Sequence, residues 1–499
     1  MIIFLSILLI LISILYYYLM SNYDYFEKKN VPYDKPVLLF GNIRDRLLQK
    51  VCLHDFMQYY YMKYKNNHPI CGVYEGRNPR YLVLDFNLVK DIFIRDFDHF
   101  TDRSLFNFKQ ADILKDLLLM SSGPIWKPTR AKLTPAFSSG KLKAMDVLIQ
   151  RCGEQMSQHL LERKNPDEEL EMKQFFGLFT LDVISNCAFG IESNPWKETD
   201  PELITAFRNF DSMTTLTRMR LLASLVLMPH YFRRFVTVWI FNKKTAYFIA
   251  NIIRNTREYR LKNNQRRNDF LQLLLDISAQ EEEEKPEHRL MDVDHVISQS
   301  ILFMIAGFET SSTLLGFAAY ELALNPEVQN TLRAEIKSVL EKHNNVCNYD
   351  AVQDMHYLEM VLLETLRKHS PVARIDRCCV KEYKIRGTDI VMEKGMNVSV
   401  PVVGFHYDPT YFPNPEKFDP LRFQENRNPD GFLSFGIGPR NCIGKRFALI
   451  STKFAMVYLI KDFELKATEK TEVPYTKRKI GILLYPQNGL HVKISKLNE

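Results

Sequence analysis

One short segment combines the residue types that bind and tune a metal. Residues 435–444 read Phe-Gly-Ile-Gly-Pro-Arg-Asn-Cys-Ile-Gly and place a single cysteine, Cys442, in a loop of glycines and a proline. We expect Gly436, Gly438 and Gly444 to adopt backbone angles that side chains disfavour, so that the loop folds tightly around one sulfur. Backbone N–H groups aimed at a sulfur stabilise its thiolate, the form that binds metals. The sequence therefore predicts a thiolate ligand at Cys442.

The segment that follows, from Lys445 onward, has the pattern of a helix. Its apolar residues recur at three- and four-residue spacing and include Phe447, Ala448, Ile450, Phe454, Ala455, Tyr458 and Leu459. Cys442 would then lie just before a helix N-terminus, where the helix dipole stabilises negative charge. Arg440, two residues before the cysteine, supplies a cation for a carboxylate.

This loop resembles the haem-binding loop of the cytochrome P450 family. The family pattern is Phe-x-x-Gly-x-Arg-x-Cys-x-Gly, and its fixed positions are matched by Phe435, Gly438, Arg440, Cys442 and Gly444. The alternative to a haem-binding loop is a buried free cysteine beside a turn. The number of positions that match the family pattern within ten residues argues against that alternative. A dinucleotide-binding loop is rejected because Asn441 stands where G-x-G-x-x-G needs its third glycine.

A long helix is predicted upstream, from Asp292 to Leu324. Asp294 lies in its first turn, where a carboxylate interacts favourably with the helix dipole. Asn325-Pro326 ends the helix and begins the next one, with Asn325 as the expected cap and Pro326 at the first helical position.

The middle of this helix reads Ala306-Gly307-Phe308-Glu309-Thr310-Ser311. We expect Gly307 to let a flat ligand approach the backbone, and the Thr310 hydroxyl to enter the helical hydrogen-bond ladder. The alternative is an ordinary helical glycine, with a threonine that bonds to the turn before it. The segment resembles the family's oxygen-binding motif, (Ala/Gly)-Gly-x-(Asp/Glu)-Thr. That resemblance places Ala306 and Gly307 beside the haem and assigns proton delivery to Thr310 and Glu309.

The resemblance also assigns four residues to the haem propionates. Trp126 and Arg130 are four residues apart, share a helix face and match the family's Trp-x-x-x-Arg. Arg103 and Arg377 fall at propionate-binding positions of related microsomal members. The alternatives are a core aromatic for Trp126 and a solvated side chain for Arg130. Pro128 departs from the family pattern and predicts a shifted helix start, because proline is tolerated only in a helix's first turn.

A structural network is predicted from Glu364, Arg367 and Arg422. The first two lie three apart on an apolar helix over 358–368 and match the family's Glu-x-x-Arg. Arg422 lies in Phe-Asp-Pro-Leu-Arg-Phe, which resembles the family's Phe-x-Pro-x-Arg-Phe. The resemblance implies a buried three-residue ion network, whereas a surface salt bridge is the plain alternative.

The resemblance implies a mainly α fold with small β-sheets. Local patterns predict a hairpin over 70–85 that turns at Asn78-Pro79, strands over 379–385 and 389–401, and a strand tip over 479–484. The expected substrate pocket is lined by five segments, namely 104–121, 203–225, 299–310, 370–376 and 477–484. Residues 221–241 are either a membrane-interface element or the pocket roof, and both interpretations stay open.

The N-terminal segment predicts a membrane anchor. Residues 2–20 carry no charge, and as a helix they would span about 28 Å, enough for a bilayer core. A cleaved signal peptide is the alternative, but no basic segment precedes the apolar run and no small-x-small site follows it. Lysines at 28, 29 and 35 favour a cytosolic body. We expect an anchor over 1–22, a proline-containing connector over 23–36 and a haem-thiolate catalytic domain over 37–499, in the endoplasmic reticulum membrane.

Charge and cysteine usage narrow the class of partner. The net charge of +7 is moderate and suits an anionic membrane or an acidic protein. No basic stripe interleaved with aromatics is present, so no nucleic-acid partner is expected. Eight scattered cysteines include no C-x-x-C and fit neither a zinc site nor a disulfide scaffold.

By resemblance, the chain is a monooxygenase with haem b as its cofactor and O2 as its co-substrate. It has no NADPH or flavin motif, so electrons are expected from NADPH through NADPH–cytochrome P450 reductase, with cytochrome b5 as a second candidate donor. The basic docking face would include Lys445, Arg446, Lys141 and Lys143. The expected substrate is a lipophilic small molecule, either a xenobiotic or an endogenous lipid or hormone. Two alternatives stay open: a haem-thiolate isomerase or dehydratase, and a non-catalytic haem binder. The Glu309-Thr310 pair argues against both.

Overall fold

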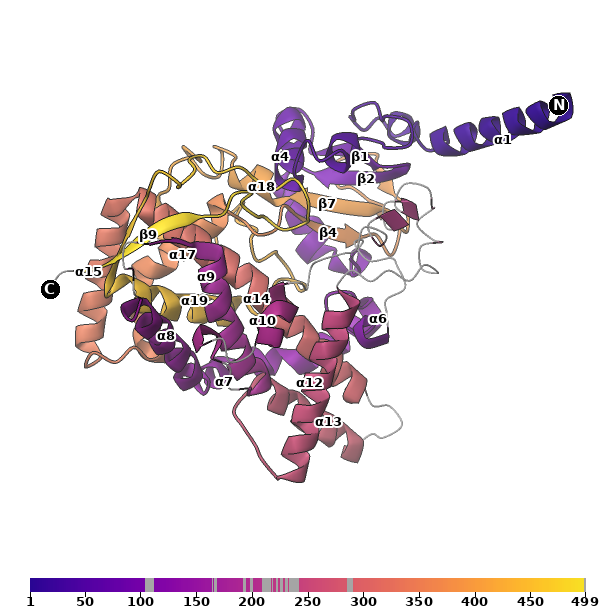
Figure 1. The fold of residues 1–499 in the computed structure, drawn as a ribbon. Helices are drawn as coiled ribbons and strands as arrows, with labels where there is room; N and C mark the ends of the chain where they lie inside the picture. The colour runs from indigo at the N-terminus through magenta and orange to yellow at the C-terminus, as the bar shows by residue number, and fades with distance from the viewer. Residues whose placement is uncertain are drawn as a thin grey trace.

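The computed structural model describes residues 1–103, 112–163, 165, 168–191, 194–197, 201–208, 242–284 and 290–497, with a few isolated positions between 217 and 232. A helical part and a smaller β-rich part lie side by side, and the two termini lie at opposite ends (Figure 1). The expected mainly α fold with small sheets is confirmed.

The helices occupy both parts of the molecule. In chain order they are α1 (Ile2–Met20), α2 (Tyr25–Lys28), α3 (Arg44–Leu47), α4 (Leu53–Tyr64), α5 (Phe86–Lys90), α6 (Gly123–Leu133), α7 (Ser139–Lys143), α8 (Asp146–Leu161), α9 (Met172–Ile184), α10 (Pro201–Arg208), α12 (Lys243–Lys262), α13 (Phe270–Glu284), α14 (Val293–Leu324), α15 (Pro326–Lys342), α16 (Tyr349–Asp354), α17 (His356–Lys368), α18 (Val402–His406) and α19 (Lys445–Ile460). The helical part surrounds α14, which runs through its middle (Figure 1).

Three small sheets complete the described fold. The largest has the order β1-β2-β7-β4, built from Ile70–Glu75, Asn78–Val83, Asn397–Pro401 and Arg374–Cys378. Within it, β2 and β7 are parallel and the other two pairs are antiparallel. The second sheet joins β3 (Glu169–Glu171), β9 (His491–Lys496) and β8 (Phe463–Lys466), and the third pairs β5 (Tyr383–Lys384) with β6 (Val391–Met392).

The sequence-based strand predictions need correction at several points. The hairpin turns at Gly76-Arg77, and Asn78-Pro79 begins β2 instead of forming the turn. Proline is tolerated there because it lies at the start of the strand, next to the turn. The sequence also missed β4, whose residues Arg-Ile-Asp-Arg-Cys include three charges and which pairs with β7 over its whole length. Residues 479–484 form no named strand and contain one isolated bridge, from Leu483 to Val372.

Helix α14 is the long central helix that the sequence predicted. Asp292 caps its N-terminus, where the carboxylate accepts a hydrogen bond from the backbone N–H of His295 at 2.8 Å. Asn325 does not cap α15 with its side chain as expected. Its amide instead donates back to the carbonyl of Glu321 at 2.8 Å, which satisfies one of the last carbonyls of α14.

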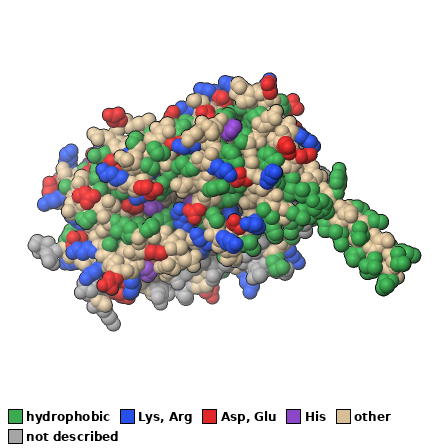
Figure 2. Space-filling model, turned by 90° about the horizontal axis from the view of Figure 1, so that it is seen from above, with side chains coloured by type: hydrophobic (Ala, Val, Ile, Leu, Met, Phe, Trp, Pro, Cys, Tyr) green, Lys and Arg blue, Asp and Glu red, His purple; other side chains and the backbone are tan. Residues whose placement is uncertain are grey.

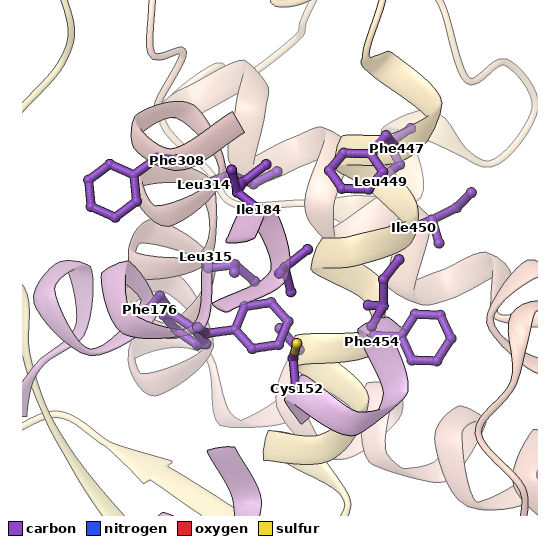
Figure 3. Packing of buried hydrophobic residues seen from close by; sticks show 14 of the residues in the cluster. Cys152, Phe176, Ile184, Phe308, Leu314, Leu315, Phe447, Leu449, Ile450 and Phe454 are labelled. Atoms are coloured by element: carbon purple, nitrogen blue, oxygen red, sulfur yellow. The ribbon is translucent and has the colours of Figure 1, made fainter. Parts of the chain in front are cut away.

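Apolar side chains from α14 and three neighbouring helices form part of the core. Figure 3 shows this packing, with labelled residues from α8 (Cys152), α9 (Phe176, Ile184), α14 (Phe308, Leu314, Leu315) and α19 (Phe447, Leu449, Ile450, Phe454). Because α14 is apolar on nearly all sides, it is stable only when other helices surround it.

The N-terminal helix α1 projects from the body (Figure 1), and on the face shown in Figure 2 it is covered by hydrophobic side chains. Among the described helices, α1 and α14 are long and apolar enough to cross a membrane. The most apolar window of α14 is 72% buried and that of α1 only 6%, which makes α14 a core helix and leaves α1 exposed.

The segment predicted as a connector is bound to the body. Tyr23, Phe26 and Val31 are buried in the apolar cluster of the β-rich part, and Tyr33 bridges to Gly72 of β1. The base of α1 is held as well, because the Arg77 guanidinium lies 3.7 Å from the ring centre of Tyr18.

A buried ion network attaches the segment before the cysteine loop to α17. Arg367 donates to both carboxylate oxygens of Glu364, at 2.7 and 2.8 Å, and neither side chain is accessible to solvent. Arg367 also donates to the carbonyls of His406 and Pro415. Arg422 completes the network, with its Nε 3.3 Å from the same carboxylate. The structure thus brings together the three residues that the sequence proposed for it.

We predict that Arg367→Ala lowers the free energy of unfolding by about 3–5 kcal/mol, because it leaves the Glu364 carboxylate buried with only part of its charge balanced. Thermal unfolding of the full-length protein measures the effect. The matched control is Lys143→Ala, which removes an exposed ion pair with Asp350 and should change stability by at most about 1 kcal/mol. An Arg367→Ala protein as stable as the control would contradict a structural role for the network.

Candidate functional site

The loop before α19 is closed as the glycines predicted. The backbone N–H of Cys442 donates to the carbonyl of Phe435 at 2.8 Å. Gly436 and Gly438 have φ values of 71° and 75°, which L side chains rarely adopt. At Gly438 a Cβ would also overlap the carbonyl oxygen of Phe93. Gly444 is different, since its φ is −88° and any residue adopts that angle; the expectation for this position was wrong.

Cys442 is a free cysteine three residues before the start of α19, and it keeps accessible surface. Burial of its sulfur raises the pKa of the thiol. The N–H of Gly444 and the charges of Arg130, Arg103 and Lys445 act in the opposite direction. The residue thus keeps access for a ligand, and its neighbours offset only part of the burial that disfavours a thiolate.

An aromatic cluster fixes the start of α19 against α14. The ring of Phe447 lies 5.4 Å from Phe270, which lies 5.6 Å from Phe303 of α14. Phe137 contacts both Phe270 and Phe303, at 4.8 and 5.3 Å. Because rings at these distances pack tightly, the cysteine loop and the oxygen motif three residues after Phe303 are held in one rigid unit.

Four arginines converge on the cysteine loop. Arg103 donates to the carbonyl of Arg440 at 3.0 Å, and Arg130 donates to the carbonyl of Asn441 at 2.9 Å. Arg440 donates to the carbonyl of Ser121. The fourth arginine, Arg377 on β4, packs against the ring of Phe93 and donates to the carbonyl of Asp376. These backbone contacts fix the guanidinium groups but do not neutralise them.

The surroundings of these guanidinium groups suit an anionic ligand. Burial and the neighbouring Arg103 lower the pKa of Arg440 to about 9. Burial, Arg103 and Arg440 lower the pKa of Arg377 well below its usual value. Buried side-chain nitrogens without a hydrogen-bond partner occur on Arg103 (Nε), Arg377 (Nε) and Arg440 (Nε and Nη1). A ligand with two carboxylates would satisfy these donors and balance the charge.

Trp126 and Arg130 lie on α6 as the sequence predicted. Trp126 is buried, and the Arg440 guanidinium lies 4.4 Å from its ring centre, a cation–π contact that fixes the arginine. The expectation for Pro128 was wrong. The helix begins at Gly123 with Pro124 in its first turn, so Pro128 lies in the helix interior and the carbonyl four residues before it lacks its usual donor.

The oxygen motif includes an exposed position in the middle of α14. Ala306 is exposed, although the residues at 296–304 and 311–323 are buried. Thr310, one turn later on the same face, donates its hydroxyl hydrogen bond to the carbonyl of Ala306 at 2.5 Å. This is the bond to the preceding turn that the alternative interpretation of Thr310 describes. Its role in proton delivery stays a prediction.

Gly307 has a packing role that the sequence did not indicate. A Cβ at this position would overlap Cδ1 of Ile184, at the end of α9. The glycine therefore allows α9 to pack closely against α14, and the approach of a flat ligand to this position stays a prediction.

Glu309 is held by two residues that the sequence did not indicate. Its Oε2 accepts hydrogen bonds from Lys173 Nζ on α9 and from the Tyr485 hydroxyl, both at 2.8 Å. Neither partner lies in a recognisable motif, and both are more than 130 residues away along the chain. No sequence signal could have paired them.

Comparisons with known proteins agree with this site. The cytochrome P450 family model matches residues 31–493. The chain is 35% identical over 490 residues to a Drosophila melanogaster protein described as probable cytochrome P450 6a14, with 95% of this chain and 96% of that protein covered. It is 35% identical to cytochrome P450 6k1 of Blattella germanica, with 99% and 97% covered, and 33% identical to cytochrome P450 6A1 of Musca domestica, with 98% and 97% covered.

The chain belongs to the cytochrome P450 family. The resemblance seen in the sequence is confirmed, and the chain is a cytochrome P450 monooxygenase. Membership in this family implies a haem-thiolate cofactor. The residues present fit that group, because a cysteine with accessible surface lies beside guanidinium nitrogens that lack anions. Parts of the predicted pocket of this cytochrome P450, at 104–111 and 209–216, and most of residues 221–241, lie outside the described residues.

We predict that Gly307→Ala destabilises this cytochrome P450 by about 1–3 kcal/mol through overpacking against Ile184. Adding Ile184→Val removes the overlapping Cδ1 and should restore most of the loss. The control is Gly177→Ala on α9, where a Cβ would lie 3.8 Å from Phe308, an ordinary contact. Thermal unfolding compares the variants. If the double variant stays as defective as Gly307→Ala, close ligand approach and not helix packing requires the glycine.

Proposed function

We propose that this cytochrome P450 inserts one oxygen atom of O2 into lipophilic small molecules, as a microsomal enzyme that receives electrons from NADPH–cytochrome P450 reductase. The observation that carries the proposal is the set of partly unpaired guanidinium groups around the Cys442 loop. The expected substrates are xenobiotics or endogenous lipids and hormones. The insect relatives of the same family, named cytochromes P450 6k1 and 6A1, support the assignment to this type of enzyme.

The residues around the cysteine loop would hold the haem. Cys442 would supply the protein ligand to the iron, and Arg103, Arg130, Arg377 and Arg440 would bind the propionates, with Trp126 supporting Arg440 from behind its guanidinium. Bound in this way, the haem supplies the activation of O2 and the oxidation of a C–H bond. The protein's contribution is to orient the substrate, to exclude water and to deliver protons.

Thr310 is the proposed proton-delivering residue. Its hydroxyl lies one turn after the exposed Ala306 and donates to the carbonyl of that residue. A hydroxyl in that place can rotate to hold a water molecule or another polar group while it keeps contact with the helix.

The electron donor is proposed to dock near the cysteine loop. Arg446 and Lys141 are exposed there, and Lys143 is exposed but paired with Asp350 at 2.7 Å. Lys445 is partly covered, since its ammonium lies 5.3 Å from the ring centre of Phe435. Exposed cations of this kind suit the acidic surface expected of a reductase or of cytochrome b5.

We propose that α1 anchors the protein in the endoplasmic reticulum membrane with the body in the cytosol. The helix is apolar and exposed along its length, and its base is fixed to the β-rich part by Tyr18 and Arg77. Because residues 23–33 are packed into the body, the anchor would hold the body at a defined distance from the membrane instead of on a free linker.

We predict that Cys442→Ser abolishes the long-wavelength absorption band of the reduced carbon monoxide complex, because that band requires a thiolate ligand. The control is Cys347→Ser, which replaces a buried cysteine between α15 and α16 and should leave the band unchanged. The spectrum of the purified protein, together with NADPH-dependent product formation in the presence of reductase, tests the assignment. A Cys442→Ser protein that keeps the band would refute it.

We predict that Thr310→Ala keeps the carbon monoxide band but forms less product per NADPH consumed, with hydrogen peroxide released instead. A positioned proton donor is worth roughly 10²–10⁴-fold in rate, and water can replace part of that. Thr310→Ser retains a hydroxyl and should recover coupling. The control is Ser312→Ala, whose hydroxyl bonds to the carbonyl of Glu309. An unchanged ratio of product to NADPH in Thr310→Ala would mean that protons arrive by another route.

A further inference from the structure

The carboxylate of Glu309 joins three segments that are distant in the sequence. On α14 it lies one residue before Thr310, and its Oε2 accepts hydrogen bonds from Lys173 of α9 and Tyr485, both at 2.8 Å. The side chains of Glu309 and Lys173 are each only 16% exposed, so this ion pair is partly shielded from water. Successive helical residues are about 100° apart around the axis. Glu309 therefore projects in a different direction from Thr310.

Tyr485 belongs to a loop that contacts a second predicted pocket segment. The loop, residues 477–486, is closed by a bridge between its ends and by a hydrogen bond from the N–H of Arg478 to the carbonyl of Tyr485 at 2.8 Å. The N–H of Leu484 donates to the carbonyl of Pro371 at 2.9 Å. Movement of the loop would therefore move segment 370–376, which leads into β4.

The ring of Tyr485 is fixed as well as its hydroxyl. The Lys173 ammonium lies 4.4 Å from the ring centre, and the Arg478 guanidinium lies 3.9 Å from it. Cations at these distances are attracted to the ring. The loop tip, by contrast, is exposed: Ile480 and Ile482 retain 39% and 54% of their accessible surface. Tyr485 is thus one attachment point of a loop whose exposed part is its tip, residues 480–482.

We propose that Glu309, Lys173 and Tyr485 form a latch that fixes loop 477–486 against α14, and that Lys173 and Tyr485 are thereby positioning residues for substrate oxidation. Glu309 then acts mainly by holding loop 477–486, a wall of the predicted pocket. One of its two hydrogen bonds comes from Tyr485 of that loop and the other from Lys173 of α9. The effect on substrate rests on the proposed function; the attachment of the loop to α14 does not.

Limited proteolysis tests the attachment without any substrate. The loop carries three consecutive trypsin sites, Lys477, Arg478 and Lys479. Tyr485→Phe and Lys173→Met each remove one donor to the carboxylate, and Glu309→Gln removes its charge. We expect each to raise the rate of cleavage at these sites about tenfold, because loss of a hydrogen bond to a charged group favours local opening. Lys173→Arg should restore protection.

The control for these variants is Lys470→Met. It removes a lysine from the same C-terminal region, where Lys470 pairs with Glu169 at 2.9 Å on the surface. This variant should cleave at the parental rate. In the Glu309→Gln background, Lys173→Met should add little, because residues that act through one group are not additive. The proposal of a latch would be wrong if Tyr485→Phe, Lys173→Met and Glu309→Gln were all cleaved at the parental rate. It would also be wrong if the effects of Glu309→Gln and Lys173→Met on the cleavage rate were fully additive.

A second experiment tests the consequence for the reaction. With reductase and a substrate that the parent oxidises, Tyr485→Phe should raise KM and the spectrally measured Kd about tenfold, with a smaller change in kcat. If the loop loosens while KM and Kd stay parental, the loop is attached as proposed but does not position substrate. If Lys173→Met improves coupling of NADPH to product without loosening the loop, Glu309 serves proton delivery and the latch is refuted. A parent that oxidises no substrate would refute the proposed function alone.

Discussion

The site depends on buried positive charge that the protein itself does not balance. Backbone carbonyls accept hydrogen bonds from the four arginines of the site, which are Arg103, Arg130, Arg377 and Arg440. Among the described residues, only Asp102 lies within ion-pair distance of any of these guanidinium groups, 4.0 Å from that of Arg440. Bringing like charges out of water is unfavourable unless an anion accompanies them. A ligand that carries two carboxylates would reverse the penalty, so the fold and its proposed cofactor stabilise each other.

Rigid packing places this charge beside the oxygen motif. The rings of Phe137, Phe270, Phe303 and Phe447 connect the first turn of α19 to α14, while the Glu364–Arg367 pair holds the segment before the cysteine loop on α17. The loop is therefore fixed on both sides of Cys442 by different forces, apolar packing after it and a buried ion network before it. The chain before Cys442 and the chain after it are thus both held in place before any ligand binds. A site whose residues are already held in place is pre-organised, and it loses less conformational freedom on binding.

Local chemistry explains what the sequence could predict. The glycines at 436 and 438, the long α14 and the helix after Cys442 follow from residue types and periodicity over short distances. Some errors were local, such as the backbone angle at Gly444 and the place of Pro128 in α6. Others depended on a neighbour from elsewhere in the chain. The packing of Ile184 against Gly307 was not indicated by the sequence, and β4 was missed because its charged residues pair with Glu75 and Arg80 of other strands in the same sheet. The partners of Glu309 were not predictable for the same reason.

A second acidic residue of α14, Glu321, connects the helix to Tyr475 in the C-terminal region. Glu321 accepts a hydrogen bond from His369 at 2.6 Å, and the other ring nitrogen of His369 lies 3.1 Å from the Tyr475 hydroxyl. Burial opposes ionisation of Glu321, but His369 and Lys368 overcome this and lower its pKa to about 2. Glu309 and Glu321 are twelve residues apart, about 18 Å along the helix. Glu309 binds Tyr485 near the end of loop 477–486, and Glu321 reaches Tyr475, just before its start, through His369. The helix that carries the oxygen motif therefore fixes both ends of a predicted pocket wall, so a shift of α14 would change the oxygen site and the shape of the pocket together.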